Sequence, residues 1–269
     1  MTKTISTPPP PIAVEAAVSL EAGSPETMPR FILLAGRGNS GKTLLLRWLC
    51  GAAQEAGRAM PIIADGDRTN RTLGSYFAEV SSPANADDLV VDRWLEGLIQ
   101  TQVETRRDLV LDLGGGDLVL RRKATADGLL ELFAELGVCP VVLHLIGPEV
   151  ESLSYLASLE EGGVFAPDRT ALVLNDGLVP AGQIESEVFE PVRAHPVFRQ
   201  AVRRGCMPLA MPSLRSAREV SDRRLTFHDA AHGRVRDGQK PIGPFERQRI
   251  RMWLRAMDAA FAPIVEWLP

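Results

Sequence analysis

Residues 36–43 have the sequence Gly36-Arg37-Gly38-Asn39-Ser40-Gly41-Lys42-Thr43, which fits the pattern GxxxxGKS/T at every fixed position. The motif lies between an apolar run that predicts a strand and an amphipathic segment that predicts a helix. Glycines in such a loop let successive backbone N–H groups point at phosphate oxygens, and the helix adds its positive end. Lys42 then reaches the β- and γ-phosphates, and the Thr43 hydroxyl ligates Mg²⁺. These eight residues therefore predict a site for a nucleotide and Mg²⁺.

The pattern around this loop predicts the fold class. Short apolar runs bounded by Gly, Asp, Asn or Pro are typical of buried strands, and they occupy Phe31–Ala35, Met60–Ala64, Leu109–Leu113, Val138–Ile146, Thr170–Leu174 and Met207–Met211. Apolar spacings of three and four predict helices at Lys42–Ala56, Asp92–Glu104, Ala124–Leu136, Pro148–Glu160 and Ile184–Arg204. Alternating strands and helices predict an α/β fold, a mostly parallel sheet with helices on both faces. Such a sheet binds ligands at the carboxyl ends of its strands.

Composition sets the domain limits and excludes several classes of protein. Residues 1–29 are rich in Pro, Ala, Ser, Thr and Glu, so we expect a flexible leader, and residues 30–269 are expected to form one domain. No apolar run approaches the roughly 20 residues of a membrane-spanning helix, and no apolar signal region follows Met1. Cys50, Cys139 and Cys206 are too widely spaced for a CxxC site. A cytoplasmic protein is expected.

Charge is distributed unevenly along the chain. The net charge is −4, yet residues 193–255 contain 15 Lys and Arg against 5 Asp and Glu. This Arg-rich region either contacts phosphates or forms solvated helix faces.

Acidic residues at two predicted strand ends supply candidate metal ligands. Asp112 ends a buried run and precedes Gly114-Gly115-Gly116, the position from which a carboxylate holds the magnesium shell. Asp65 and Asp67 follow the second run at i, i+2 spacing, and are suited to the metal shell and the attacking water. An Asp-Gly-Asp sequence is also a good turn.

Together, these motifs resemble the ParA/MinD family of deviant Walker A ATPases over about residues 30–230. In that family the loop begins Lys-Gly-Gly, and its signature lysine reaches across a nucleotide-sandwich dimer to the partner's phosphates. This chain has Arg37, Gly38 and Asn39 at those positions. Arginine keeps the positive charge and adds a planar fork suited to phosphate. The resemblance therefore implies a homodimer in the ATP state with Arg37 acting in catalysis; the alternative is that Arg37 is an exposed loop residue.

The resemblance also implies further roles. Asp67 would orient the hydrolytic water and Asp65 would support the Mg²⁺ shell, although residues 67–73 lack the Pro and Gln of the family's first switch. Asn175 would bond the adenine edge, and Pro212 belongs to the loop that would flank the base. Asp176 follows Asn175, unlike the Lys-x-Asp of guanine-binding sites, which favours ATP.

The expected function is a slow, partner-stimulated ATPase that acts as an ATP-driven dimerisation switch. The Gly-rich segment after Asp112 resembles the plasmid stability and mobilisation branch, so the expected role is plasmid partition, plasmid stability or conjugative mobilisation. The same expectation includes a related role in which the protein positions DNA or protein cargo. Two alternatives remain: a non-hydrolysing scaffold for a polar or conjugation complex, and a small-molecule P-loop kinase or ligase.

Three further features concern DNA, membrane or metal binding. The family resemblance suggests non-specific DNA binding through residues 193–255, with Arg203, Arg204, Arg223 and Arg224 as the best candidates. A C-terminal apolar stripe predicts a helix that either docks on its own domain or a partner, or contacts a membrane: Ile250, Leu254, Met257, Phe261, Ile264 and Leu268. His228 and His232 have the i, i+4 spacing of a zinc pair but lack the intervening Glu of HExxH and any companion Cys.

Overall fold

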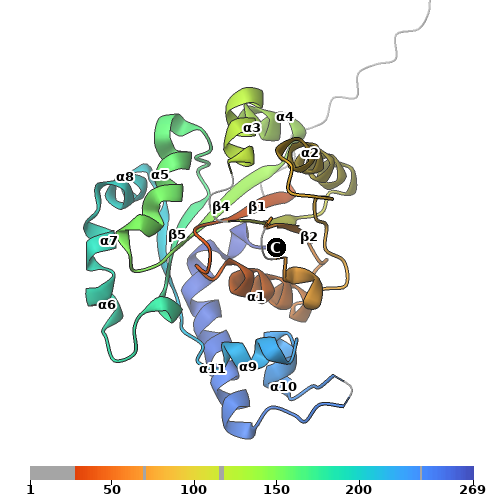
Figure 1. The fold of residues 1–269 in the computed structure, drawn as a ribbon, viewed down its shortest axis with the longest axis vertical. Helices are drawn as coiled ribbons and strands as arrows, with labels where there is room; N and C mark the ends of the chain where they lie inside the picture. Colours follow the sequence, from red (N-terminus) through yellow and green to blue (C-terminus); the bar gives the residue numbers. More distant parts are fainter. Residues whose placement is uncertain (1–27, 69–70, 115–117, 237) are drawn as a thin grey trace, which may run out of the picture.

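The structure is a computed structural model that describes residues 28–68, 71–114, 118–236 and 238–269. A six-stranded sheet with the order β2-β3-β1-β4-β5-β6 runs through its centre, and every neighbouring pair is parallel (Figure 1). The strands are β1 Arg30–Ala35, β2 Ile62–Gly66, β3 Leu109–Leu113, β4 Cys139–Ile146, β5 Thr170–Asn175 and β6 Met207–Met211. The predicted leader lies almost entirely outside the described residues.

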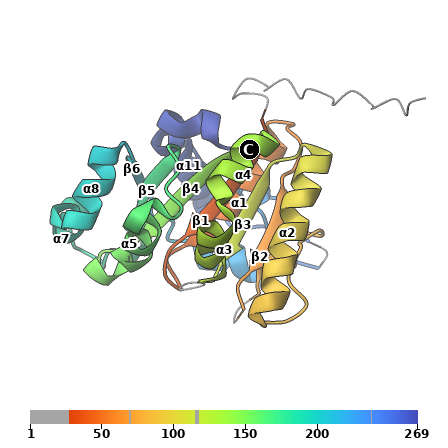
Figure 2. The same cartoon turned by 90° about the horizontal axis from the view of Figure 1, so that it is seen from above.

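Helices cover both faces of the sheet because its strands are apolar on both sides (Figure 2). One face packs against α1 Lys42–Glu55, α9 Ala217–Asp222, α10 Phe227–His232 and α11 Pro244–Phe261. The other packs against α2 Asp88–Thr105, α3 Val119–Asp127, α4 Leu129–Leu136, α5 Ser154–Glu160, α7 Glu190–Ala194 and α8 Pro196–Arg204. Phe31 and Leu33 face the second layer, whereas Ile32 and Leu34 face the first. The predicted α/β class is thereby confirmed.

Several element boundaries differ from the prediction for local reasons. The second strand begins at Ile62, directly after Pro61, because proline has no N–H to donate to the ladder. The Met60 carbonyl, which lies before the strand, accepts hydrogen bonds from the Arg107 side chain. The predicted helix 124–136 is two helices joined at Gly128, whose φ is 60°. The predicted helix 184–204 is interrupted at Phe189 and His195, giving α6 Glu185–Val188, α7 and α8, because Pro191 and Pro196 fit only in the first turn of a helix. Short 3₁₀ helices complete the chain: η1 Leu73–Ser75, η2 Val150–Leu153, η3 Glu161–Gly163, η4 Asp176–Leu178 and η5 Ala262–Trp267.

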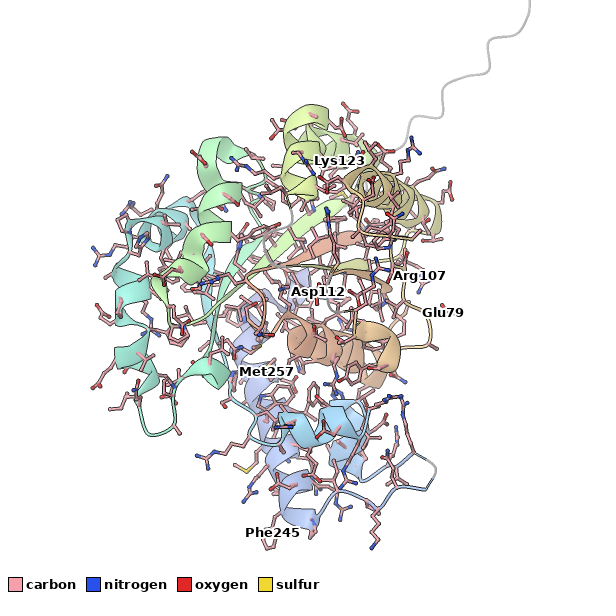
Figure 3. The ribbon with its side chains drawn as sticks, in the orientation of Figure 1. Glu79, Arg107, Asp112, Lys123, Phe245 and Met257 are labelled. Carbon is pink, nitrogen blue, oxygen red and sulfur yellow. The ribbon has the colours of Figure 1, made fainter. Side chains whose placement is uncertain are left out.

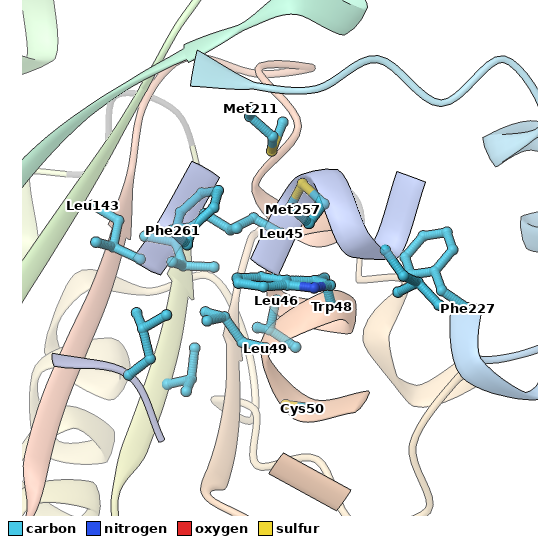
Figure 4. Close-up of a cluster of buried hydrophobic side chains, with 14 of the residues drawn as sticks. Leu45, Leu46, Trp48, Leu49, Cys50, Leu143, Met211, Phe227, Met257 and Phe261 are labelled. Atoms are coloured by element: carbon cyan, nitrogen blue, oxygen red, sulfur yellow. The ribbon is translucent and has the colours of Figure 1, made fainter. Parts of the chain in front are cut away.

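The C-terminal apolar stripe lies in the core beside α1. All six of its residues are buried, and the rings of Trp48 and Phe261 lie 4.8 Å apart (Figure 4). The helix ends at Phe261, and Pro263 lies in the first turn of the 3₁₀ helix that follows from Ala262. The stripe therefore covers the first helix and is not available to a membrane, which corrects that alternative.

None of the helices in the described ranges is long and apolar enough to cross a membrane.

Candidate nucleotide-binding site

The loop between β1 and α1 has the backbone conformation that its glycines predict. Gly36 has a φ of 145°, and a Cβ there would lie 2.5 Å from the Leu145 carbonyl oxygen. Gly41 has a φ of 100°, and a Cβ there would lie 2.5 Å from Asn175 Nδ2. Asn39 has a φ of 61°, in the left-handed region that asparagine adopts more readily than most residues. Asn39, which stands where the ParA/MinD pattern has its second glycine, is therefore compatible with the conformation of this loop.

Lys42 is positioned over this loop. Its Nζ donates to the carbonyl oxygens of Gly36 at 3.2 Å and Arg37 at 3.1 Å, and the side chain is buried. Burial lowers the pKa of Lys42, whereas the charges of Asp112 and Asp67 raise it. Helix α1 has no side-chain cap and no acidic residue in its first turn. A polyphosphate would therefore meet free helix N–H groups and one ammonium group.

Thr43 and Asp112 join α1 to the end of β3. The Thr43 hydroxyl donates to Asp112 Oδ2 at 3.2 Å, while buried Asp112 Oδ1 has no partner among the described residues. Burial raises the pKa of Asp112 to about 7, opposed by the charge of Lys42 and the bond from Thr43. An oxygen-only pair with an unused carboxylate oxygen suits Mg²⁺, which prefers such ligands and favours the ionised carboxylate. Asp112 lies at the centre of the molecule above α1 (Figure 3).

Asp65 lies beside Asp112, but its carboxylate binds backbone N–H groups of the segment that follows β2. The two residues are register partners in β2 and β3, and both are buried. Asp65 Oδ1 accepts from the Asp67 N–H at 3.2 Å, and Oδ2 accepts from the Leu73 N–H at 3.3 Å. Burial raises the pKa of Asp65, and these two bonds lower it. Asp65 thus shapes the segment that carries Asp67; its support of a Mg²⁺ shell stays a prediction.

Asp67 lies between this shaped loop and the end of β3. A Cβ at Gly114 would lie 3.5 Å from the Asp67 carboxyl carbon, so the segments after β2 and β3 approach closely. The role of Asp67 in orienting water stays a prediction. Thr69 and Asn70 of the expected switch, and Gly115, Gly116 and Asp117 of the Gly-rich segment, lie outside the described residues.

Arg37, Gly38 and Asn39 form the exposed edge of the loop, whereas Ser40 is buried. Arg37 has no side-chain hydrogen bond or ion pair with any other residue in the part of the chain that the structure describes. Such a guanidinium is free to contact a second molecule. Its action on a partner's phosphates stays a prediction.

Asn175 and Pro212, expected near the base, both have partners within the chain. Asn175 Nδ2 donates to the Ser40 carbonyl at 2.8 Å, and its Oδ1 accepts from the Gly177 N–H at 2.9 Å. The Pro212 carbonyl accepts from Trp253 Nε1 at 2.8 Å. The structure thus places Asn175 against the phosphate loop, and both contacts to a base stay predictions.

The basic region is divided between two parts of the molecule. Helix α8 lies near β6 (Figure 2), whereas α9 and α10 lie below α1 and α11 runs past it (Figure 1). Arg204 forms a salt bridge with Glu160 at 2.5 Å, and Arg223 forms one with Glu219 at 2.8 Å. Arg203 and Arg224 are exposed. Two of the four arginines that were expected to bind DNA, Arg204 and Arg223, therefore form salt bridges within the chain.

His228 and His232 do not gain a third ligand. Among the residues that the structure describes, no three His, Cys, Asp or Glu side chains gather to hold a metal ion.

Arg47 is a buried residue that sequence reasoning did not single out. It is 4% exposed, donates to Ser221 Oγ and to the Leu225 carbonyl at 2.7 Å each, and lies 3.8 Å from the Tyr76 ring centroid. Burial lowers its pKa to about 10. The sequence feature that points to this residue is the position of an arginine inside the apolar run Leu44–Leu49. This guanidinium connects the segment after β2 to α9 and to the turn before α10.

No family model matches the sequence, and no curated protein matches it. Solved structures align with it at low identity. HypB from Helicobacter pylori in complex with nickel is 12% identical over 74% of this chain and 85% of its own, with a TM-score of 0.42. Chloroplast FtsY from Physcomitrella patens is 12% identical over 87% and 67%, with a TM-score of 0.42. The MinC:MinD cell division protein complex of Aquifex aeolicus gives 13% identity over 86% and 96%, with a TM-score of 0.44. At this distance the similarity carries no information on function.

Proposed function

We propose that this protein is a Mg²⁺-dependent ATPase that works as an ATP-driven dimerisation switch. The observation that carries the proposal is the phosphate loop with the Thr43–Asp112 pair beside it. Lys42 is held over the same loop. Lysine, hydroxyl and carboxylate groups in this arrangement are the parts that P-loop nucleotide hydrolysis requires.

Each group has a proposed task. Lys42 leaves the two loop carbonyls to bind the β- and γ-phosphates, while Thr43 and Asp112 hold Mg²⁺. When bound, Mg²⁺ neutralises charge on the phosphate oxygens. Asp67 orients the attacking water, and Asp65 keeps Asp67 in place through the two backbone N–H groups that it binds. Because these are positioning and electrostatic tasks, turnover without a partner is expected to be slow.

The exposure of Arg37 supports dimerisation. A second copy that presents its own Arg37 to the bound phosphates would stabilise the ATP state, because a planar guanidinium matches phosphate oxygens. Hydrolysis removes the γ-phosphate and with it part of this contact. The dimer is therefore expected with ATP and not with ADP.

Solution mass by light scattering tests the proposal directly. We expect the mass to double in Mg²⁺-ATP and to stay monomeric in Mg²⁺-ADP, with phosphate released over time. Lys42→Ala is the non-binding control, and Arg37→Ala is expected to bind ATP without doubling. Unchanged mass with bound ATP would contradict the switch, and ATP consumption accelerated by a metabolite would favour the kinase or ligase alternative.

The proposed cargo is plasmid DNA or a protein of a partition or conjugation complex. This part rests on the motif resemblance and on the exposed Arg203 and Arg224. Binding through phosphate contacts weakens steeply as salt is added. Retention of DNA that does not change with salt would contradict it.

A further inference from the structure

The amide of Asn175 joins two segments that are distant in sequence. It lies at the end of β5, is 5% exposed, and reaches the Ser40 carbonyl 135 residues earlier in the chain. Its other end is fixed, because Oδ1 accepts from the Gly177 N–H. The amide therefore has a defined orientation, with its donor directed at the phosphate loop.

This contact determines the orientation of one loop peptide. In a trans peptide the C=O and N–H groups point in opposite directions. Because Asn175 binds the Ser40 carbonyl, the Gly41 N–H points away from Asn175. No other residue type fits at position 41 without strain, since its φ is 100° and a Cβ would lie 2.5 Å from Asn175 Nδ2 and 3.1 Å from Met211 Cε. The ends of β5 and β6 thus enclose the Ser40–Gly41 peptide.

We propose that Asn175 is a positioning residue for phosphate binding: it holds the Ser40 carbonyl toward the end of β5, away from the phosphates, and so aims the Gly41 N–H at the bound phosphates. The inference rests on the proposed nucleotide site and adds how that site is oriented. If the Ser40 carbonyl turned toward the phosphates instead, it would present a partial negative charge to the phosphate oxygens. Loss of the amide donor therefore weakens polyphosphate binding whether or not a base is attached.

The test compares Asn175→Leu, which keeps the approximate side-chain size and removes the donor without placing a negative charge beside the phosphates, with a matched control. Asn85 makes the same kind of contact, its Oδ1 accepting from the Asp87 N–H at 2.9 Å, and is exposed. Calorimetric titration of the full chain with Mg²⁺-ATP, Mg²⁺-GTP and inorganic tripolyphosphate measures each affinity. We expect Asn175→Leu to weaken the binding of every ligand by the same factor, about tenfold, and Asn85→Leu to change none.

Each outcome has a defined meaning. Loss confined to one nucleotide, with tripolyphosphate unaffected, would overturn the inference and make Asn175 a base-contacting residue. Unchanged binding of all ligands would also overturn it while leaving the proposed function intact. Failure of the unmodified chain to bind any of them would overturn the proposed function itself, and the inference with it.

A double-mutant cycle tests the geometry by a second route. Gly41→Ala places a methyl group against Asn175 Nδ2, and Asn175→Ala removes that contact. If the two residues act through each other, the fold-loss of tripolyphosphate affinity caused by Gly41→Ala is smaller in the Asn175→Ala chain. Equal losses in both chains would show that they act independently, against the inference. Circular dichroism of each variant establishes that the compared chains are folded.

Discussion

The Thr43 hydroxyl lies 3.2 Å from Asp112 Oδ2, so a hydrogen bond joins the first turn of α1 to the end of β3. Both groups are oxygen ligands of the kind that Mg²⁺ prefers, so Thr43 and Asp112 would together hold the ion. Thr43→Ser keeps the hydroxyl, whereas Thr43→Ala removes it. We expect the alanine variant to lose at least about tenfold in affinity for Mg²⁺-ATP and the serine variant to stay near the original value. Titrations with Mg²⁺ and with EDTA distinguish the metal contribution, and equal binding by both variants would contradict this role.

Asp67→Ala separates nucleotide binding from hydrolysis. The Asp65 carboxylate binds the backbone N–H of residue 67, and this contact survives the substitution. We therefore expect ATP binding to remain while phosphate release falls about 100-fold, the size of a typical general-base contribution. The ATP dimer should then persist in light scattering after the unmodified protein has returned to monomer. Normal phosphate release by the variant would show that Asp67 does not act on the water.

His144 makes stability depend on pH. It is 2% exposed in β4, and burial, followed by the charge of Arg204, lowers its pKa to about 3. Between about pH 6.5 and 3 the unfolded chain binds a proton that the folded chain excludes, so this group removes stability as pH falls through that window. At pH 5 the loss relative to pH 8 is about 2 kcal/mol.

Urea unfolding at pH 5 and pH 8 measures this effect. His144→Leu is expected to reduce the difference in unfolding free energy between the two pH values by that amount. The exposed His232 provides the matched control, because His232→Leu should leave the difference unchanged. An identical pH difference in the unmodified and His144→Leu chains would contradict the assignment.

Arg47 stabilises the contact between the segment after β2 and the C-terminal helices. Arg47→Met keeps the approximate length but leaves the buried Leu225 carbonyl without its donor. Arg47→Lys keeps the charge but lacks the fork that contacts Ser221 and Leu225 together. We expect each to lower the free energy of unfolding by about 1–3 kcal/mol. Arg93→Met, on the exposed side of α2, should change it by less than about 0.5 kcal/mol; equal effects at both positions would contradict the role of Arg47.

The sequence predicted the features that depend on local pattern. The six strands were predictable because short apolar runs alternate with amphipathic segments, and the phosphate loop because its glycines and lysine have fixed spacing. Contacts across the fold were not predictable. Nothing near Asn175 in the sequence indicates that its amide binds Ser40, and nothing near Arg47 indicates Leu225 as its acceptor. Helices α9 and α10 are six residues each, too short for apolar periodicity to reveal them.

The packing of α11 against α1 has a consequence for synthesis of the chain. The phosphate loop and α1 are made early, but Trp48 gains its contact with Phe261 only when the last long helix has been made. Until then an apolar face of the helix that follows the loop stays uncovered during translation. We therefore expect the nascent chain to acquire its nucleotide affinity late, at the same time as α11 docks.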